Sequence, residues 1–182
     1  MTKRTYRLFV DLTGTADTQK NLEKVLEQLI EFFAQRNIEL CPYLISDGHK
    51  RDVNDFVKLR RMKTLKGWFS STDIENIKRT SSSFSQELQF GETDIIALID
   101  DHSLPLERLK FILGREISSH EAERYFIHYE GDLFAPIPFT DYFEKMMEKG
   151  EKQIAEQNNE GKMLASSEEA YSTSLAPHDL EK

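Results

Sequence analysis

The stretch that decides the fold is RLFVDLTGT, residues 7–15. It is an apolar run that ends on one carboxylate, Asp11, and passes directly into a Thr-Gly-Thr turn. The run DIIALI, residues 94–99, ends in the same way on Asp100 and Asp101. If both runs are strands of one parallel sheet, their carboxyl ends share the edge at which open α/β sheets gather ligands. The sequence therefore predicts three carboxylates in one crevice.

Such a cluster indicates a metal site, because neighbouring carboxylates repel one another unless a cation neutralises them. Carboxylates, threonine oxygens and backbone carbonyls are hard oxygen ligands, and these suit Mg²⁺. A plainer interpretation is that an aspartate at a strand end caps the helix that follows it. That interpretation stays open for either strand end alone, whereas the two together favour the metal.

Composition limits the classes of partner. The chain has 182 residues, enough for one α/β domain with an appendage. Its net charge of −8 leaves no basic surface for nucleic acid and no polybasic segment for a membrane, so we expect neither partner. Cys41 is the only cysteine, which excludes an internal disulfide and a cysteine-based metal cluster. It lies in an apolar run, which favours a buried, inert thiol.

The N-terminus leads into the first apolar run without an apolar signal segment, and no apolar run is long enough to cross a membrane. We therefore expect a cytoplasmic protein.

Apolar residues recur with alternating strand and helix periods along most of the chain. The expected strands are residues 7–11, 38–45, 94–99 and 125–129, and the expected helices are residues 22–33, 53–65, 83–90 and 106–113. Residues 73–77 should form a short turn or strand, Pro42 should mark a sheet edge or an irregularity, and Gly114 should end the last helix. This order predicts a Rossmann-like α/β fold, with a mainly parallel sheet and helices on both faces.

The sequence also predicts where the domain ends. We expect residues 1–150 to form the α/β domain and residues 151–182 to form an acidic, disordered C-terminal tail, because they are polar, rich in Ser and Glu and nearly free of aromatics. This tail also resembles the C-terminal translocation signals of bacterial secreted effectors, although a plain disordered tail is the simpler interpretation.

Four features in order carry a resemblance to a known family. They are Asp11-Leu12-Thr13-Gly14-Thr15, Ser46 after the second strand, Lys78 before a helix, and Asp100-Asp101. Together they resemble the four motifs of the haloacid dehalogenase superfamily of phosphohydrolases, over residues 5–130. The resemblance implies a fold of this family with little or no cap domain, since no extra folded insert separates Asp11 from Ser46.

The resemblance also implies a mechanism. Asp11 would attack phosphorus and form an aspartyl-phosphate, which divides a difficult displacement into two easier steps. Mg²⁺ would bridge the carboxylates and the phosphoryl group, which carry the same sign of charge. The implied catalytic residues are Asp11 and Thr13. The implied metal ligands are Asp11, Thr13 through its carbonyl, Asp100 and Asp101. The implied substrate-binding residues are Thr15, Ser46 and Lys78.

Several of these residues have plainer interpretations. Ser46 in Ser-Asp-Gly is also an ordinary turn residue, and Lys78 beside Arg79 could be one of two solvated cations. Three other lysines compete for the role of Lys78, namely Lys58, Lys63 and Lys66. His102, directly after the acidic pair, is expected to be a loop residue or cap rather than a metal ligand.

Thr13 departs from the pattern of the family's phosphatases, which usually carry a second aspartate at this position. That aspartate protonates the leaving oxygen, and threonine cannot act as an acid near pH 7. P-type ion pumps of the same superfamily also carry Thr there. We therefore expect slow turnover, or substrates whose leaving groups depart without protonation, such as acyl phosphates or the tyrosine phenol with its pKa of about 10. The expected partner is a phosphorylated protein or a small phosphate ester.

Two alternatives remain. The same turn satisfies the Asp-x-Ser/Thr-x-Ser/Thr pattern of von Willebrand A-type modules, with Thr80 as a second-loop hydroxyl and Asp100 as a later acidic ligand. Such a module would bind a protein through its metal without catalysis. Alternatively, Thr13 marks an inactive relative of the phosphohydrolases that binds a partner through the old cleft.

Overall fold

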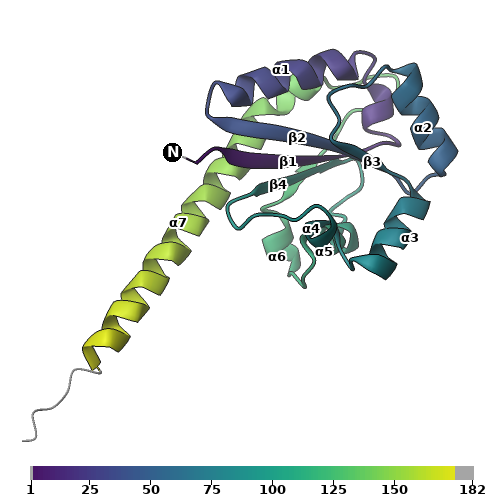
Figure 1. The fold of residues 1–182 in the computed structure, drawn as a ribbon. Coiled ribbons are helices and arrows are strands. Elements are labelled where there is room, and N and C mark those ends of the chain that lie inside the picture. Colours follow the sequence, from purple (N-terminus) through teal and green to yellow (C-terminus); the bar gives the residue numbers. More distant parts are fainter. Residues whose placement is uncertain (1, 175–182) are drawn as a thin grey trace, which may run out of the picture.

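The computed structural model describes residues 2–174, which form one five-stranded sheet with helices on both faces (Figure 1). The strand order is β3-β2-β1-β4-β5, and every neighbouring pair is parallel. The strands are β1 (Arg4–Asp11), β2 (Ile38–Ile45), β3 (Gly67–Phe69), β4 (Ile95–Asp100) and β5 (Phe126–His128). The predicted Rossmann-like α/β fold is therefore confirmed.

The helices divide between the two faces of the sheet. One core cluster joins the sheet to α1 (Leu22–Ala34), α2 (Lys50–Leu59) and α7 (Phe143–Ser174). The other joins it to α3 (Ser71–Thr80), α4 (Phe84–Glu87), α5 (Leu106–Leu113) and α6 (Ser119–Ala122). Two short 3-10 helices are η1 (Ala16–Thr18) and η2 (Phe139–Tyr142).

Strand β1 lies at the centre of this arrangement, and residues 8–10, which lead to Asp11, are all apolar and buried. Leu8 and Val10 belong to one core cluster and Phe9 to the other, because successive side chains point to opposite faces. A strand that is buried on both faces needs a continuous apolar run rather than an alternating one. Asp11 ends this run at the carboxyl edge of the sheet.

Pro42 lies within strand β2, at a point where the sheet locally lacks a neighbouring strand on one side. Strand β2 is an inner strand, but Pro42 lies where β3 has not yet begun: its carbonyl accepts a hydrogen bond from the backbone N of Lys66 (2.8 Å), and β3 starts at Gly67 opposite Tyr43. The irregularity that Pro42 predicted is therefore a local one. Cys41 beside it is buried, as expected.

Three predicted elements differ in the structure, one of them the helix expected over residues 83–90, of which only Phe84–Glu87 (α4) is helical. Residues 73–77, expected as a turn or strand, lie inside α3, which begins with a capping box between Ser70 and Asp73. This pair satisfies the free N–H groups of the first turn and starts the helix despite its polar composition. Helix α2 ends at Leu59, earlier than predicted, whereas α5 ends at Gly114 as predicted, with a positive φ of 71° there.

Helix α7 runs across residue 150, where we expected the domain to end, and packs on the sheet. Gln153 is buried, accepts a hydrogen bond from the N–H of Ile96 (2.9 Å) and donates one to its carbonyl (2.8 Å). Strand β5 pairs with β4 only from Leu98 onward, so the Gln153 amide takes the place of a neighbouring strand. One turn further on, Gln157 accepts a hydrogen bond from Arg4 (2.6 Å) and donates one to the Asp94 carbonyl (3.3 Å), and beyond it α7 projects away from the sheet (Figure 1). Residues 175–182 of the predicted tail lie outside the described residues.

None of the helices in the described part of the chain combines the length and apolar character that crossing a membrane requires.

Candidate metal and phosphate site

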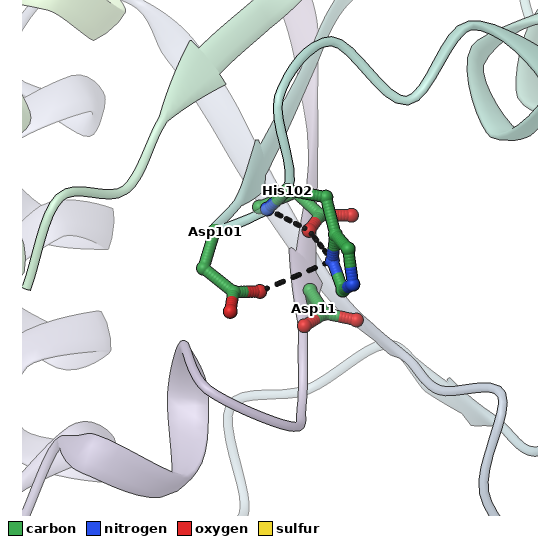
Figure 2. Close-up of side chains that lie close together, drawn as sticks. Asp11, Asp101 and His102 are labelled. Atoms are coloured by element: carbon green, nitrogen blue, oxygen red, sulfur yellow. Dashed lines mark hydrogen bonds and ion pairs between the residues drawn. The ribbon is translucent and has the colours of Figure 1, made fainter. Parts of the chain in front are cut away.

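The carboxyl ends of β1 and β4 bring the three predicted aspartates together. These strands are neighbours, and Val10 pairs with Ile99, so Asp11 and Asp100 lie side by side. One side-chain atom from each of Asp11, Asp100, Asp101 and His102 lies within 4.8 Å of the others. Figure 2 shows the side chains of Asp11, Asp101 and His102 converging above the ends of the strands. We call these four residues the acidic cluster.

Asp100 is the fixed centre of the acidic cluster, fully buried at the end of β4. Its Oδ1 accepts hydrogen bonds from the backbone N of His102 (3.0 Å) and lies 2.8 Å from His102 Nδ1. Its Oδ2 accepts a hydrogen bond from Arg108 Nη1 (2.7 Å). Both oxygens are therefore satisfied, and the carboxylate is held in one orientation.

Arg108, in the first turn of α5, is the cation that holds the acidic cluster together. Its Nη1 donates to Asp11 Oδ1 and to Asp100 Oδ2, both at 2.7 Å, and its Nη2 donates to Asp47 Oδ2 at 2.7 Å. Charge-assisted bonds of this length are the strong ones in proteins. Arg108 is not among the predicted site residues, because in the sequence it resembles any charged residue in the first turn of a helix.

Asp11 is left with an unsatisfied oxygen. The residue is only 3% exposed, and in the described part of the chain its Oδ2 is the one buried side-chain polar atom without a hydrogen-bond partner. Burial, together with repulsion from Asp100, raises the pKa of Asp11 to about 7, although Arg108 acts in the opposite direction. A buried carboxylate oxygen without a partner is costly, and such an atom in a folded protein calls for an explanation such as a bound ion.

Asp101 and His102 form the outer part of the acidic cluster. His102 is exposed, and its Nδ1 lies 3.3 Å from Asp101 Oδ1; its hydrogen bond to Asp100 raises the pKa of the imidazole. His102 lies in the loop after β4, as expected, and its side chain contacts Asp100 and Asp101 there. Gly14 has a φ of +81°, and a Cβ there would collide with the Asp101 carboxylate, so this turn requires glycine.

The remaining predicted residues lie near the acidic cluster with differing contacts. Thr15 is buried and donates a hydrogen bond to Asp101 Oδ1 (3.4 Å), whereas Thr13 is exposed on the same turn. Ser46 is buried at the end of β2, where its hydroxyl accepts a hydrogen bond from Gly48 N (2.9 Å). A hydroxyl that accepts from a backbone N–H two residues on is typical of a serine in a turn.

Lys78 lies in the last turn of α3. Its ammonium is 3.5 Å from Glu75 and 5.4 Å from the ring centre of Phe111, so it makes contacts outside the acidic cluster. Thr80, which the A-type module would use as a metal ligand, donates its hydroxyl to the Asn76 carbonyl of its own helix (2.9 Å).

A cavity of about 940 Å³ opens beside the acidic cluster. Asp100, His102 and Arg108 line it at the end nearest the strands, while Ile74, Lys78 and Phe111 contribute walls from α3 and α5. Cavities of this size hold small-molecule ligands. Lys78 therefore shares a cavity with the acidic cluster without contacting it.

Comparisons of the chain with protein-family models, with curated proteins and with solved structures found no match. The features that bear on function are therefore the Rossmann-like fold, the acidic cluster at its carboxyl edge and the adjoining cavity.

Proposed function

We propose that this chain is a Mg²⁺-dependent phosphatase or phosphotransferase of the haloacid dehalogenase type, with Asp11 as the phosphoryl acceptor. The observation that carries the proposal is the buried, unpartnered Oδ2 of Asp11 beside two further carboxylates. An aspartate that only capped a helix would have its oxygens on backbone N–H groups. Asp11 instead contacts Arg108 and keeps one oxygen free.

The residues of the acidic cluster fit a hard divalent cation. Asp11, Asp100 and Asp101 would hold it, together with the carbonyl of Thr13, and all of these are oxygen ligands. A bound Mg²⁺ would neutralise the carboxylates and offset the charge that develops during phosphoryl transfer. The raised pKa of Asp11 agrees with this assignment, because burial first and the neighbouring Asp100 second disfavour its charged form, and a bound cation would offset both effects.

In the proposed reaction, a carboxylate oxygen of Asp11 forms a bond to phosphorus while the bond from phosphorus to the leaving oxygen breaks. Water then cleaves the aspartyl-phosphate, or an acceptor alcohol takes the phosphoryl group. Thr13 at this turn holds no acidic proton for the leaving oxygen. The proposed substrates are therefore aryl or acyl phosphates, whose leaving groups depart as anions more readily than alkoxides.

The cavity supports the same substrate class. Ile74 and Phe111 give its walls an apolar surface that suits an aromatic leaving group, and Lys78 adds a cation over the Phe111 ring. A phosphotyrosine side chain of a partner protein is the physiological substrate that we propose.

Hydrolysis of p-nitrophenyl phosphate and acetyl phosphate by the full chain tests the proposal. We expect turnover in Mg²⁺ that EDTA abolishes and that Asp11→Asn removes. Asp55→Asn is the matched control, because Asp55 is exposed on α2 and forms an ion pair with Arg51 of the same helix. An Asp11→Asn protein that keeps full activity would show that the reaction does not pass through this carboxylate.

One observation favours a second candidate, a catalytically inactive relative that binds a partner through the cleft. Arg108 already places a positive charge between Asp11 and Asp100. If this guanidinium stands in for the metal permanently, the chain binds no Mg²⁺ and turns over neither substrate. The assay above separates this candidate from the enzyme.

A further inference from the structure

A divalent cation held jointly by Asp11 and Asp100 would compete with Arg108 for these two carboxylates. The Nη1 of Arg108 is 2.7 Å from Asp11 Oδ1 and 2.7 Å from Asp100 Oδ2, two atoms from neighbouring strands. An ion held by this pair would lie about 2.0–2.1 Å from each of them. A guanidinium and a dication at such separations would be only a few ångströms apart and would repel each other strongly.

The contacts of Arg108 allow its side chain to leave without moving the fold. Helix α5 is fixed in the core by Leu109 and Ile112, which are fully buried, independently of the guanidinium. The third partner of Arg108 is Asp47, whose side chain is 84% exposed at the rim of the cavity. Arg108 also lines the open cavity, so the guanidinium has room on the side away from Asp11.

The two carboxylates differ in what they would gain from the exchange. Asp100 is fully satisfied by Arg108 and His102, whereas Asp11 has one bond from Arg108 and one buried oxygen with no partner. A divalent cation would therefore replace the bonds from Arg108 and also relieve the unpartnered Asp11 oxygen. Asp11 therefore gains more than Asp100 when a cation replaces Arg108. This gain favours cation binding and opposes the loss of the Arg108 hydrogen bonds.

We propose that Arg108 is a displaceable internal cation: it closes the metal-free acidic cluster and must leave Asp11 and Asp100 when a divalent cation binds. This inference rests on the metal site of the proposed function. Arg108 thereby weakens the apparent affinity for Mg²⁺, since every binding event first breaks its bonds to both carboxylates. The released guanidinium then faces the cavity, where a planar fork of N–H donors suits a phosphate or carboxylate group.

Calorimetric titration of Mg²⁺ into the full chain tests the competition. Arg108→Gln removes the positive charge but keeps a polar side chain, shorter than Arg, that can still donate a hydrogen bond. Lys110→Gln is the matched control, because Lys110 lies two residues further along α5 and pairs with Glu107 and Glu116. We expect Arg108→Gln to bind Mg²⁺ roughly tenfold more tightly than wild type, which corresponds to the loss of about one charge-assisted hydrogen bond. Lys110→Gln should bind like wild type.

An Arg108→Gln protein that binds Mg²⁺ with unchanged or weaker affinity overturns the inference and leaves the metal site itself intact. If none of the three proteins binds Mg²⁺, both the inference and the proposed metal site are wrong. These two failures are therefore distinguishable.

A measurement on the wild-type chain covers the case in which Arg108→Gln fails to fold. The guanidinium NMR signal of Arg108 is assigned by its loss in Arg108→Lys. As added Mg²⁺ shifts the backbone amide signals of Asp100 and Asp101 to their saturated positions, the Arg108 signal should shift with them and exchange faster with water. If those backbone signals shift while the Arg108 signal stays fixed, the guanidinium is not displaced and the inference is wrong.

Discussion

Replacing Asp11 with Asn should stabilise the metal-free protein, and this gain should grow as the pH rises. The pKa of Asp11 is about 7 in the folded chain, against an ordinary value of 3.8, because the carboxyl group is buried beside Asp100. Between these two values the folded state keeps a proton that the unfolded chain releases. The stability that this proton provides is complete below pH 3.8 and is lost as the pH rises to about 7.

The magnitude follows from the two pKa values. A difference of about three pH units at about 1.4 kcal/mol per unit amounts to about 4 kcal/mol, which is the upper limit of the cost of holding Asp11 ionised above pH 7. Asn has the same shape and no charge, so it avoids this cost. Between pH 5 and pH 8 the advantage of Asp11→Asn in the free energy of unfolding should grow by about 2–3 kcal/mol.

Urea unfolding at pH 5 and pH 8, with EDTA present, measures this difference. Asp47→Asn is the control, because Asp47 also contacts Arg108 but is exposed, and removing a surface pair changes stability by only about 0–1 kcal/mol. If Asp11→Asn is no more stable than wild type at pH 8, or if its advantage is the same at both pH values, the reasoning about a strained buried carboxylate is refuted.

Three further predictions concern the same turn and strand ends. Asp100→Asn should lose most of the affinity for Mg²⁺ in calorimetry. Equal affinity in wild type and Asp100→Asn would show that Asp100 is not a metal ligand. Gly14→Ala should lower the free energy of unfolding by about 1–2 kcal/mol, because φ at Gly14 is +81° and a Cβ there meets Asp101; unchanged urea unfolding would contradict this. Thr13→Asp should raise turnover of alkyl phosphates more than of aryl phosphates, since only alkoxides need a proton, and equal gains for both would show that another group supplies it.

The sheet could be predicted from the sequence because its signals are local. Residues 8–10 and 95–99, which lead to Asp11 and Asp100, are all apolar, as strand segments buried on both faces must be. Their parallel pairing follows from the helices between them, and it places the three aspartates at one edge. Helix α3 was missed because its residues are mostly polar, although the capping pair Ser70 and Asp73 marked its start.

The parts that could not be predicted depend on contacts between residues far apart in the chain. Gln153 is a polar residue in a polar segment, and only the short β5 strand gives it the free edge of Ile96 to bind. Arg108 resembles any charged residue in the first turn of a helix. Its role comes from its contact with Asp11, which lies 97 positions earlier in the chain, and from the register of β1 and β4, which places Asp11 beside Asp100. Neither leaves a local pattern in the sequence.

The most direct test of the central claim is fluorine NMR of beryllofluoride, a mimic of the phosphoryl group, added to the full chain. The account predicts bound fluorine signals in wild type that need Mg²⁺ and that vanish in Asp11→Asn, while Asp55→Asn retains them. Bound signals that persist in Asp11→Asn, or their complete absence from wild type with Mg²⁺, would contradict the assignment of Asp11 as the phosphoryl acceptor.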